Sequence, residues 1–224
     1  MIADNVRRVR ERIAAAAARA GRSGGDVELL AATKGRSVAE IEEAVSAGVR
    51  AIGENRVQEA AAKFPALRGR VSMHMIGHLQ RNKVRNALGI FDLIHSVDSV
   101  RLAEEIEREA ARAGGAARVL IEVNVSGEDQ KFGVAPDGLP ALLDAAAGLA
   151  HIRVEGLMAM APFSEDAEAS RPFFRRLRRL AAEAARKERP RVEMRRLSMG
   201  MTQDFETAVE EGATIVRVGA AIFG

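Results

Sequence analysis

The sequence predicts an α/β fold of the TIM type, a (β/α)8 barrel with an extra N-terminal helix. The main observation is that eight short apolar segments of strand length alternate with helical segments over the 224 residues. This alternation allows either an open, doubly wound sheet or a closed barrel. Eight strands close a barrel with a filled interior, and no Gly-x-Gly-x-x-Gly motif follows the first strand. We therefore expect the barrel.

The chain begins with an amphipathic helix that precedes the first strand. Ile2, Val6, Val9, Ile13 and Ala17 fall on one face of this helix. Because it comes before the βα units begin, we expect it to pack outside the barrel.

The strands and helices then follow in a regular order. Ser37 and Glu40 have the spacing of a capping box at the start of the second helix. Gly48, Gly114 and Gly212 lie where helices should end. The predicted strands cover residues 27–33, 50–53, 71–76, 91–95, 117–125, 152–158, 192–197 and 214–218. The predicted helices between them cover residues 37–47, 54–63, 79–88, 98–113, 136–148, 165–188 and 203–211.

Composition favours one globular domain over residues 1–224. Apolar residues make up 47% of the chain, enough for a core, and no apolar run has the length of a membrane helix. The N-terminus lacks the continuous apolar stretch of a signal peptide. There is no cysteine, which excludes disulfides and thiolate chemistry. We expect a cytoplasmic protein with no membrane partner.

Positive charge is concentrated in residues 171–196, which carry eleven Arg and Lys and three Glu. Such a segment is typical of a solvated helix face or of a surface for nucleic acid or an acidic partner. The whole chain has a formal net charge of only +3, no Trp, no Tyr and 8 Phe, so stacking platforms for bases are scarce. We therefore favour the solvated face and expect no nucleic-acid partner.

A lysine stands at the end of the first predicted strand. Residues 27–35 read Val-Glu-Leu-Leu-Ala-Ala-Thr-Lys-Gly, which places Lys34 at the start of a βα turn. In βα units, ligands bind at the carboxyl ends of the strands. A desolvated lysine in that place can lose its proton and attack a carbonyl, which arginine cannot do. These residues alone leave open the alternative of a lysine that merely reaches solvent.

Polar and glycine-rich residues follow the last two predicted strands. They are Ser198-Met199-Gly200-Met201-Thr202 and Arg217-Val218-Gly219-Ala220. In barrels of this type a phosphate commonly lies between these two loops, held by backbone N–H groups. Glycines that only serve tight turns would explain each loop taken alone. With Lys34 at the same mouth, the pattern indicates a ligand with both a phosphate and a carbonyl, and pyridoxal 5′-phosphate (PLP) fits.

Other side chains near the strand ends allow more than one interpretation. Arg217 gains a role if it faces the ring nitrogen, because a guanidinium only donates and the nitrogen must then stay unprotonated. An arginine paired with a carboxylate is the alternative. Met158 can form one wall against the ring, although methionine more often fills a core. His74 and His78 straddle a strand end instead of sharing a helix face, so we expect no metal site.

Six segments resemble the pyridoxal phosphate homeostasis protein family, which is similar to the N-terminal barrel domain of alanine racemase. They are Leu-Leu-Ala-Ala-Thr-Lys at 29–34, Gly-Glu-Asn-Arg-Val-Gln-Glu at 53–59, His-x-Ile-Gly-x-Leu-Gln-x-Asn-Lys at 74–83, Gly-Leu-Met at 156–158, Leu-Ser-Met-Gly-Met at 197–201 and Val-Arg-Val-Gly-x-Ala-Ile-Phe-Gly at 216–224. The resemblance implies a barrel that carries PLP as a Schiff base on Lys34. It places Ser198 and the backbone of Gly219 and Ala220 at the phosphate, and Arg217 at the ring nitrogen. It also implies a role in intracellular PLP (vitamin B6) homeostasis, with no reaction of its own.

The expected cofactor-binding set follows from the residues and the resemblance together. It is Lys34, Asn55, Met158, Ser198, Gly200, Arg217, Gly219 and Ala220. Two features depart from the family. Ala220 stands where relatives often have a hydroxyl residue, which removes a hydrogen bond to the phosphate, and the chain stops at Gly224, where relatives usually run on.

A PLP-dependent amino-acid enzyme, such as a racemase, is the alternative function. A two-base racemase needs a second acid–base group, and in the racemase that this chain resembles it is a tyrosine from a second domain. The sequence has no Tyr and no Cys. We therefore expect a protein that is not an enzyme, that carries PLP for PLP-dependent apo-enzymes, and that is a monomer.

Overall fold

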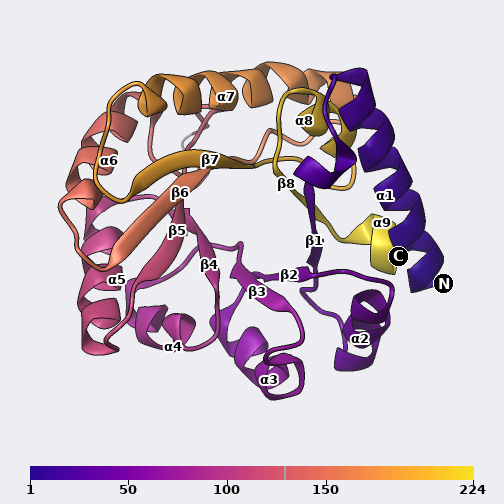
Figure 1. Ribbon diagram of the computed structural model, residues 1–224, viewed down its shortest axis with the longest axis horizontal. Helices are drawn as coiled ribbons and strands as arrows, with labels where there is room; N and C mark the ends of the chain where they lie inside the picture. Colours follow the sequence, from indigo (N-terminus) through magenta and orange to yellow (C-terminus); the bar gives the residue numbers. More distant parts are fainter. Residues whose placement is uncertain (129) are drawn as a thin grey trace.

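The computed structural model confirms the predicted barrel (Figure 1). It describes residues 1–128 and 130–224. Within these residues, eight parallel strands form a closed barrel in the order of the sequence, and β8 pairs back onto β1. The strands are β1 Glu28–Ala32, β2 Ala51–Glu54, β3 Ser72–Met75, β4 Leu93–Val97, β5 Ala117–Glu122, β6 Ile152–Met158, β7 Val192–Ser198 and β8 Ile215–Val218.

Helices surround the barrel on the outside (Figure 1). They are α1 Ile2–Arg19, α2 Val38–Ser46, α3 Val57–Leu67, α4 Val84–Leu88, α5 Val100–Arg112, α6 Leu139–Ala147, α7 Arg171–Ala185, α8 Phe205–Glu210 and α9 Ala220–Phe223. Short 3-10 turns precede β1, α4, α6 and α7. The predicted capping box is present at the start of α2, where Ser37 Oγ accepts the Glu40 N–H and Glu40 accepts the Ser37 N–H. None of the helices in the described ranges is both long enough and apolar enough to cross a bilayer.

The apolar core has two compartments, because successive strand residues point to opposite sides of the barrel wall. The larger compartment lies between the strands and the helices. The smaller one fills the barrel interior and consists of Leu30, Ala51, Leu93, Leu120, Met158 and Ile215. Ligand access is therefore restricted to the two ends of the barrel, and we call the end at which the strands finish the mouth.

The first helix lies outside the barrel, as predicted, and takes a place in the ring of helices between α8 and α2 (Figure 1). Val6, Val9, Ile13 and Ala17 of α1 are buried, and α1 packs against α8 and α9. Figure 1 shows both chain ends on this side of the molecule. The side-chain amide of Asn5 donates to the carbonyl of Ile222 at 2.8 Å and so ties the first helix to the last one.

Several element boundaries differ from the prediction. α4 and α7 begin at Val84 and Arg171, and not at residues 79 and 165, because 3-10 turns precede them. β5 ends at Glu122 and not at residue 125, because Val123 makes only an isolated bridge and Asn124 closes the following loop with its side chain. α3 begins three residues later than predicted, since Glu54 still belongs to β2 and the chain bends at Asn55. The short α9 was not predicted.

The arginine-rich segment forms α7 and the strand after it. Glu211, just after α8, accepts hydrogen bonds from Arg171 at 3.0 Å and from Arg175 at 2.8 Å. Arg171 also contacts Glu210, at 2.6 Å. Part of the positive charge of α7 is therefore neutralised within the fold.

Candidate functional site

Lys34 lies at the mouth, in the turn directly after β1. The turn is closed by the N–H of Arg36, which donates to the carbonyl of Thr33 at 3.0 Å. Lys34 is exposed, whereas Thr33 before it is fully buried. The turn therefore presents the lysine from a fixed base.

A buried ion cluster fixes that base from the side of α3. Lys63 donates to the carbonyl of Thr33 at 2.8 Å and to Glu54 and Glu59 at 2.7 Å each. Glu59 also accepts the N–H of Gly35 at 2.6 Å, so residues on both sides of Lys34 are held. Burial raises the pKa of Glu54 above its usual range, against the opposing effect of Lys63.

The hydroxyl of Thr33 completes this cluster, because it donates to Glu54 at 2.6 Å. Glu54 and Glu59, the acidic side chains beneath the turn, are thus both paired with Lys63. The side chain of Lys34 is exposed at the surface of the mouth, a position in which it can meet a ligand.

Arg217 lies inside the barrel near the mouth and is almost fully buried. One guanidinium nitrogen donates to Ser198 Oγ at 2.6 Å and the other to the carbonyl of Ala159 at 3.0 Å. Burial lowers the pKa of Arg217 to about 10, while Glu122 and Asp204 oppose that shift. The guanidinium is therefore still charged at neutral pH and presents only donors.

The loops after β7 and β8 lie against each other at the mouth. The N–H of Arg217 donates to the carbonyl of Gly200 at 3.0 Å, and the N–H of Ala221 donates to Thr202 Oγ1 at 3.4 Å. Gly200 has φ +91°, and a Cβ there would lie 2.5 Å from the Cβ of Ala208, so only glycine fits.

The backbone after β8 also lies against β1. A Cβ on Gly219 would sit 3.3 Å from the carbonyl oxygen of Ala32, two residues before Lys34. Ala220 follows Gly219 and is exposed. This contact brings the predicted phosphate loop and the predicted lysine to the same edge of the barrel.

The other predicted site residues have less specific surroundings. Asn55 is half-buried in the bend after β2, and its backbone lies so close to Gly77 that a Cβ there would be 2.5 Å from the carbonyl oxygen of Asn55. Met158 is fully buried in the interior cluster of the barrel, where it fills the core beneath the mouth.

Two buried side chains near the mouth were not among the predicted site residues. His95 of β4 is fully buried, and its Nδ1 lies 3.0 Å from Ser198 Oγ. Glu122, the last residue of β5, is 3% exposed, and burial raises its pKa to about 7, with a smaller contribution from Asp98. A titratable residue in an otherwise mainly apolar strand was the signal that could have marked both as candidates.

The histidine pair weighed in the sequence does not form a metal site. His74 points into the barrel and hydrogen-bonds with His95, at 3.1 Å. His78 is exposed, stacks on Phe132 with the ring centroids 3.9 Å apart, and lies 3.6 Å from Asp98. No cluster of three potential metal ligands occurs in residues 1–128 and 130–224.

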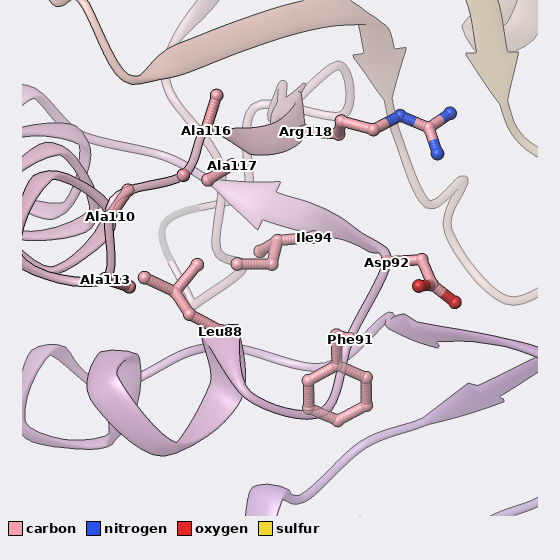
Figure 2. Close-up of a pocket in the computed structure, with 10 residues that line it drawn as sticks. Leu88, Phe91, Asp92, Ile94, Ala110, Ala113, Ala116, Ala117 and Arg118 are labelled. Atoms are coloured by element: carbon pink, nitrogen blue, oxygen red, sulfur yellow. The ribbon is translucent and has the colours of Figure 1, made fainter. Parts of the chain in front are cut away.

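Cavities lie near both ends of the barrel. One of about 600 Å³ opens beside the mouth between the loops after β2 and β3, where Asn55, His78 and Lys83 line it. Another, of about 300 Å³, lies between α4 and α5 at the start of β4 and β5 (Figure 2). Its lining combines four alanines and larger apolar side chains with the charged residues Asp92 and Arg118. It opens at the end opposite the mouth, away from Lys34 and Arg217.

Comparison with known proteins gives one consistent family. The family model described as the N-terminal domain of alanine racemase matches residues 2–224. The pyridoxal phosphate homeostasis protein of Aquifex aeolicus is 45% identical over 222 residues, which are 99% of this chain and 96% of that protein. The protein of the same name from Pseudomonas aeruginosa is 40% identical over 224 residues, which are 100% of this chain and 95% of that protein.

Solved structures agree with the sequence relatives. PipY of Synechococcus elongatus with PLP bound is 37% identical, with a TM-score of 0.87 over 100% of both chains. The same protein without PLP has a TM-score of 0.90. An alanine racemase of Clostridium difficile has a TM-score of 0.74 at 14% identity, covering 99% of this chain and 56% of that one, and here the likeness concerns the fold alone.

Proposed function

Since the chain belongs to the alanine racemase N-terminal domain family, and within it to the pyridoxal phosphate homeostasis proteins, we propose that residues 1–224 form a single PLP-binding domain. The domain takes part in PLP homeostasis by holding the cofactor at the barrel mouth and handing it on to PLP-dependent apo-enzymes. One observation carries this proposal. The backbone at Gly219 packs on Ala32, which sets the loop after β8 beside the turn of Lys34.

The residues at the mouth fit PLP in their chemistry. Lys34 supplies an amine, Arg217 supplies a fixed donor, and the loops after β7 and β8 can offer backbone N–H groups to a phosphate. PLP, when bound, supplies an aldehyde that a lysine amine can hold covalently and a ring that can withdraw electrons. Arg217 cannot give a proton up to that ring at neutral pH, because its own pKa is about 10.

The remaining predicted residues have subsidiary roles in this proposal. Gly200 and Ala220 belong to the phosphate loops, and Asn55 borders the mouth after β2. Met158 forms the floor of the mouth. Because Ala220 has no hydroxyl, the phosphate depends here on backbone N–H groups and on other side chains.

An amino-acid enzyme that uses the same cofactor is the second candidate. The observation that favours it is Glu122, a buried carboxyl at the mouth whose pKa of about 7 suits proton transfer. β5, which ends at Glu122, is four strands away from β1 around the barrel, so Glu122 and Lys34 come from opposite walls. We favour the carrier, because PLP homeostasis protein relatives match along almost the whole chain.

The assignment of Lys34 is tested by trapping the cofactor. Protein freed of ligand is titrated with PLP, and visible absorbance should rise until one equivalent is bound. Borohydride reduction and peptide mapping should then place the added mass on the peptide that contains Lys34. Lys34→Ala should abolish both signals.

Lys131→Ala is the matched control, because Lys131 is already paired with Glu128 at 2.7 Å. It should keep the absorbance and the labelled peptide. Mass on the Lys131 or Lys83 peptide, or no visible absorbance in the unmodified protein, would contradict the proposal.

A further inference from the structure

A chain of hydrogen-bonded polar side chains crosses the inside of the barrel, from the mouth to the opposite end. In order, its members are Arg217, Ser198, His95, His74, Ser72 and Asp92. Arg217 and Ser198 lie at the ends of β8 and β7, whereas Ser72 begins β3 and Asp92 precedes β4. The chain therefore connects a buried cation to a carboxylate on the far side of the barrel.

Each link has hydrogen-bond length. Arg217 donates to Ser198 Oγ at 2.6 Å, and Ser198 Oγ lies 3.0 Å from His95 Nδ1. His95 Nε2 lies 3.1 Å from His74 Nδ1. His74 Nε2 lies 3.1 Å from Ser72 Oγ, which donates to Asp92 Oδ2 at 2.9 Å.

His74 and His95, the two histidines of this hydrogen-bonded chain, are neutral at neutral pH. Burial lowers the pKa of His74 to about 4. Burial, followed by the effects of His74 and Arg217, holds the pKa of His95 well below its usual range. A neutral imidazole has one N–H donor and one acceptor nitrogen, so each ring must donate in one direction and accept in the other.

The two ends of the chain decide that direction. Arg217 can only donate and the carboxylate of Asp92 can only accept. Ser72 has a single hydroxyl proton, and turning it toward His74 would leave Asp92 Oδ2 facing a lone pair at 2.9 Å. With that proton on Asp92, His74 must donate from Nε2 to Ser72.

The upper half of the chain then follows. His74 accepts at Nδ1 from Nε2–H of His95, and His95 accepts at Nδ1 from the hydroxyl of Ser198. Every donor points away from Arg217 and toward Asp92. Such an arrangement satisfies every link and lets each hydrogen bond polarise the next one.

We propose that this one-way chain is a positioning device, in which Ser198, His95 and His74 orient the Arg217 guanidinium from below. The inference rests on the proposed function, since the oriented guanidinium would donate a hydrogen bond to the ring nitrogen of PLP. Ser198 has its only proton on His95 and its lone pair on Arg217. Ser198 is therefore a positioning residue for the group at the ring nitrogen of PLP. It has no proton left to donate to the phosphate, where the sequence predicted it to lie.

The direction of the chain can be measured without any cofactor. The sequence has four histidines, and His78→Gln with His151→Gln leaves only His74 and His95. In nitrogen-15 NMR spectra of this ligand-free variant, both remaining rings should show a protonated Nε2 and an unprotonated Nδ1. A protonated Nδ1 on either ring, or a charged imidazole at neutral pH, would overturn the proposal.

The role of Ser198 is tested by comparing PLP with pyridoxal, which lacks the phosphate. If Ser198 acts through Arg217, Ser198→Ala should weaken the binding of both ligands by the same factor, about tenfold for one lost hydrogen bond to a charged group. A loss confined to PLP would show a phosphate contact and would refute the positioning role.

Thr202→Ala is the matched comparison, because Thr202 lies in the loop after β7 and accepts the N–H of Ala221. This variant should weaken the binding of PLP more than that of pyridoxal.

His95→Gln combined with Ser198→Ala should weaken PLP binding less than the product of the single effects, because both act on the same guanidinium. If the effects of the two substitutions multiplied, the proposed hydrogen-bonded chain would be contradicted. Failure of the unmodified protein to bind PLP at all would instead refute the proposed function, whatever the histidine tautomers are.

Discussion

Two ionisable side chains are buried just inside the barrel mouth, and burial moves their pKa values toward each other. Burial lowers the pKa of Arg217 to about 10 and raises that of Glu122 to about 7. Burial disfavours the charged form of both side chains, whereas the opposite charge of the partner favours it. The mouth therefore holds a permanent cation next to an acid that titrates near neutral pH, and this second group invites a direct test.

Glu122→Gln should change how stability depends on pH. The folded protein keeps the Glu122 proton up to about pH 7, whereas the unfolded chain releases it near the ordinary value of 4.5. Raising the pH between these values therefore favours unfolding. Between pH 4.5 and about pH 7, the free energy of unfolding of the unmodified protein should fall by about 3 kcal/mol relative to that of Glu122→Gln. Urea unfolding of ligand-free protein at pH 4.5 and pH 8 measures the difference. Glu104→Gln, at an exposed position of α5, should show no such window.

At the scale of elements, helix α7 carries its arginines toward the acidic end of α8. Glu211 is 4% exposed and accepts from both Arg171 and Arg175. Burial would raise the pKa of Glu211, but these arginines outweigh it and the pKa is lowered. The ionised form is thus favoured by folding, so its stabilising effect is present above the ordinary carboxyl pKa and is lost as the pH falls below it.

Glu211→Gln should destabilise the protein by about 1–3 kcal/mol at neutral pH, because it removes the charge of a buried carboxylate that accepts from two guanidinium groups. Urea unfolding at pH 7 and at pH 3 measures this, and the difference should shrink at the lower pH. Glu183→Gln, on an exposed part of α7, is the control and should stay within about 0.5 kcal/mol of the unmodified protein. Equal effects of the two changes would show that the pairing with α8 does not stabilise the fold.

For the whole molecule, closure of the barrel depends on the two ends of the chain. β1 pairs with β8, and α1 packs on α8 and α9. The mouth is therefore assembled from residues that are far apart in sequence, such as Lys34 and Arg217. The proposed PLP site lies at this one end of the barrel, and the hydrogen-bonded side chains below it reach the opposite end.

The protein should be a monomer. Large apolar side chains that are exposed in the described ranges are Met1, Val100, Phe132 and Phe163, which lie on different loops and helix ends. A stable interface buries on the order of 1,000 Å² or more, which scattered side chains do not offer. Sedimentation at micromolar concentration should give one species of 24.1 kDa, and Phe163→Ser should not change it. A particle of twice that mass would contradict the expectation.

The PLP-loaded protein should not exchange the α-proton of amino acids at enzyme-like rates. The chain has no Tyr and no Cys, and Arg217 withholds a proton from the ring nitrogen, which limits carbanion stabilisation. The test is deuterium incorporation into alanine and other amino acids in heavy water. Exchange at about 1 per second or faster, lost in both Lys34→Ala and Glu122→Gln, would refute the carrier and establish the enzyme.

The sequence by itself determined the fold and the residues that come after each strand. The alternation of strands and helices predicted the barrel and its extra first helix, because local periodicity records which face of each element is buried. It also predicted that Lys34 and Gly219 follow strands, which the structure confirms, whereas Ser198 and Arg217, predicted to follow strands, are the last residue of β7 and a residue within β8. Parallel strands bring all four residues to one end.

Tertiary structure alone decided what each of these side chains touches. The partners of Ser198 come from β4 and β8, and those of Thr33 come from β2 and α3, so no local pattern could reveal them. The roles of His95 and Glu122 were likewise hidden, because burial in a shared interior, and not the identity of their neighbours in sequence, sets the protonation of each. Hydrogen bonds and desolvation depend on distances across the barrel, and those distances exist only after it has closed.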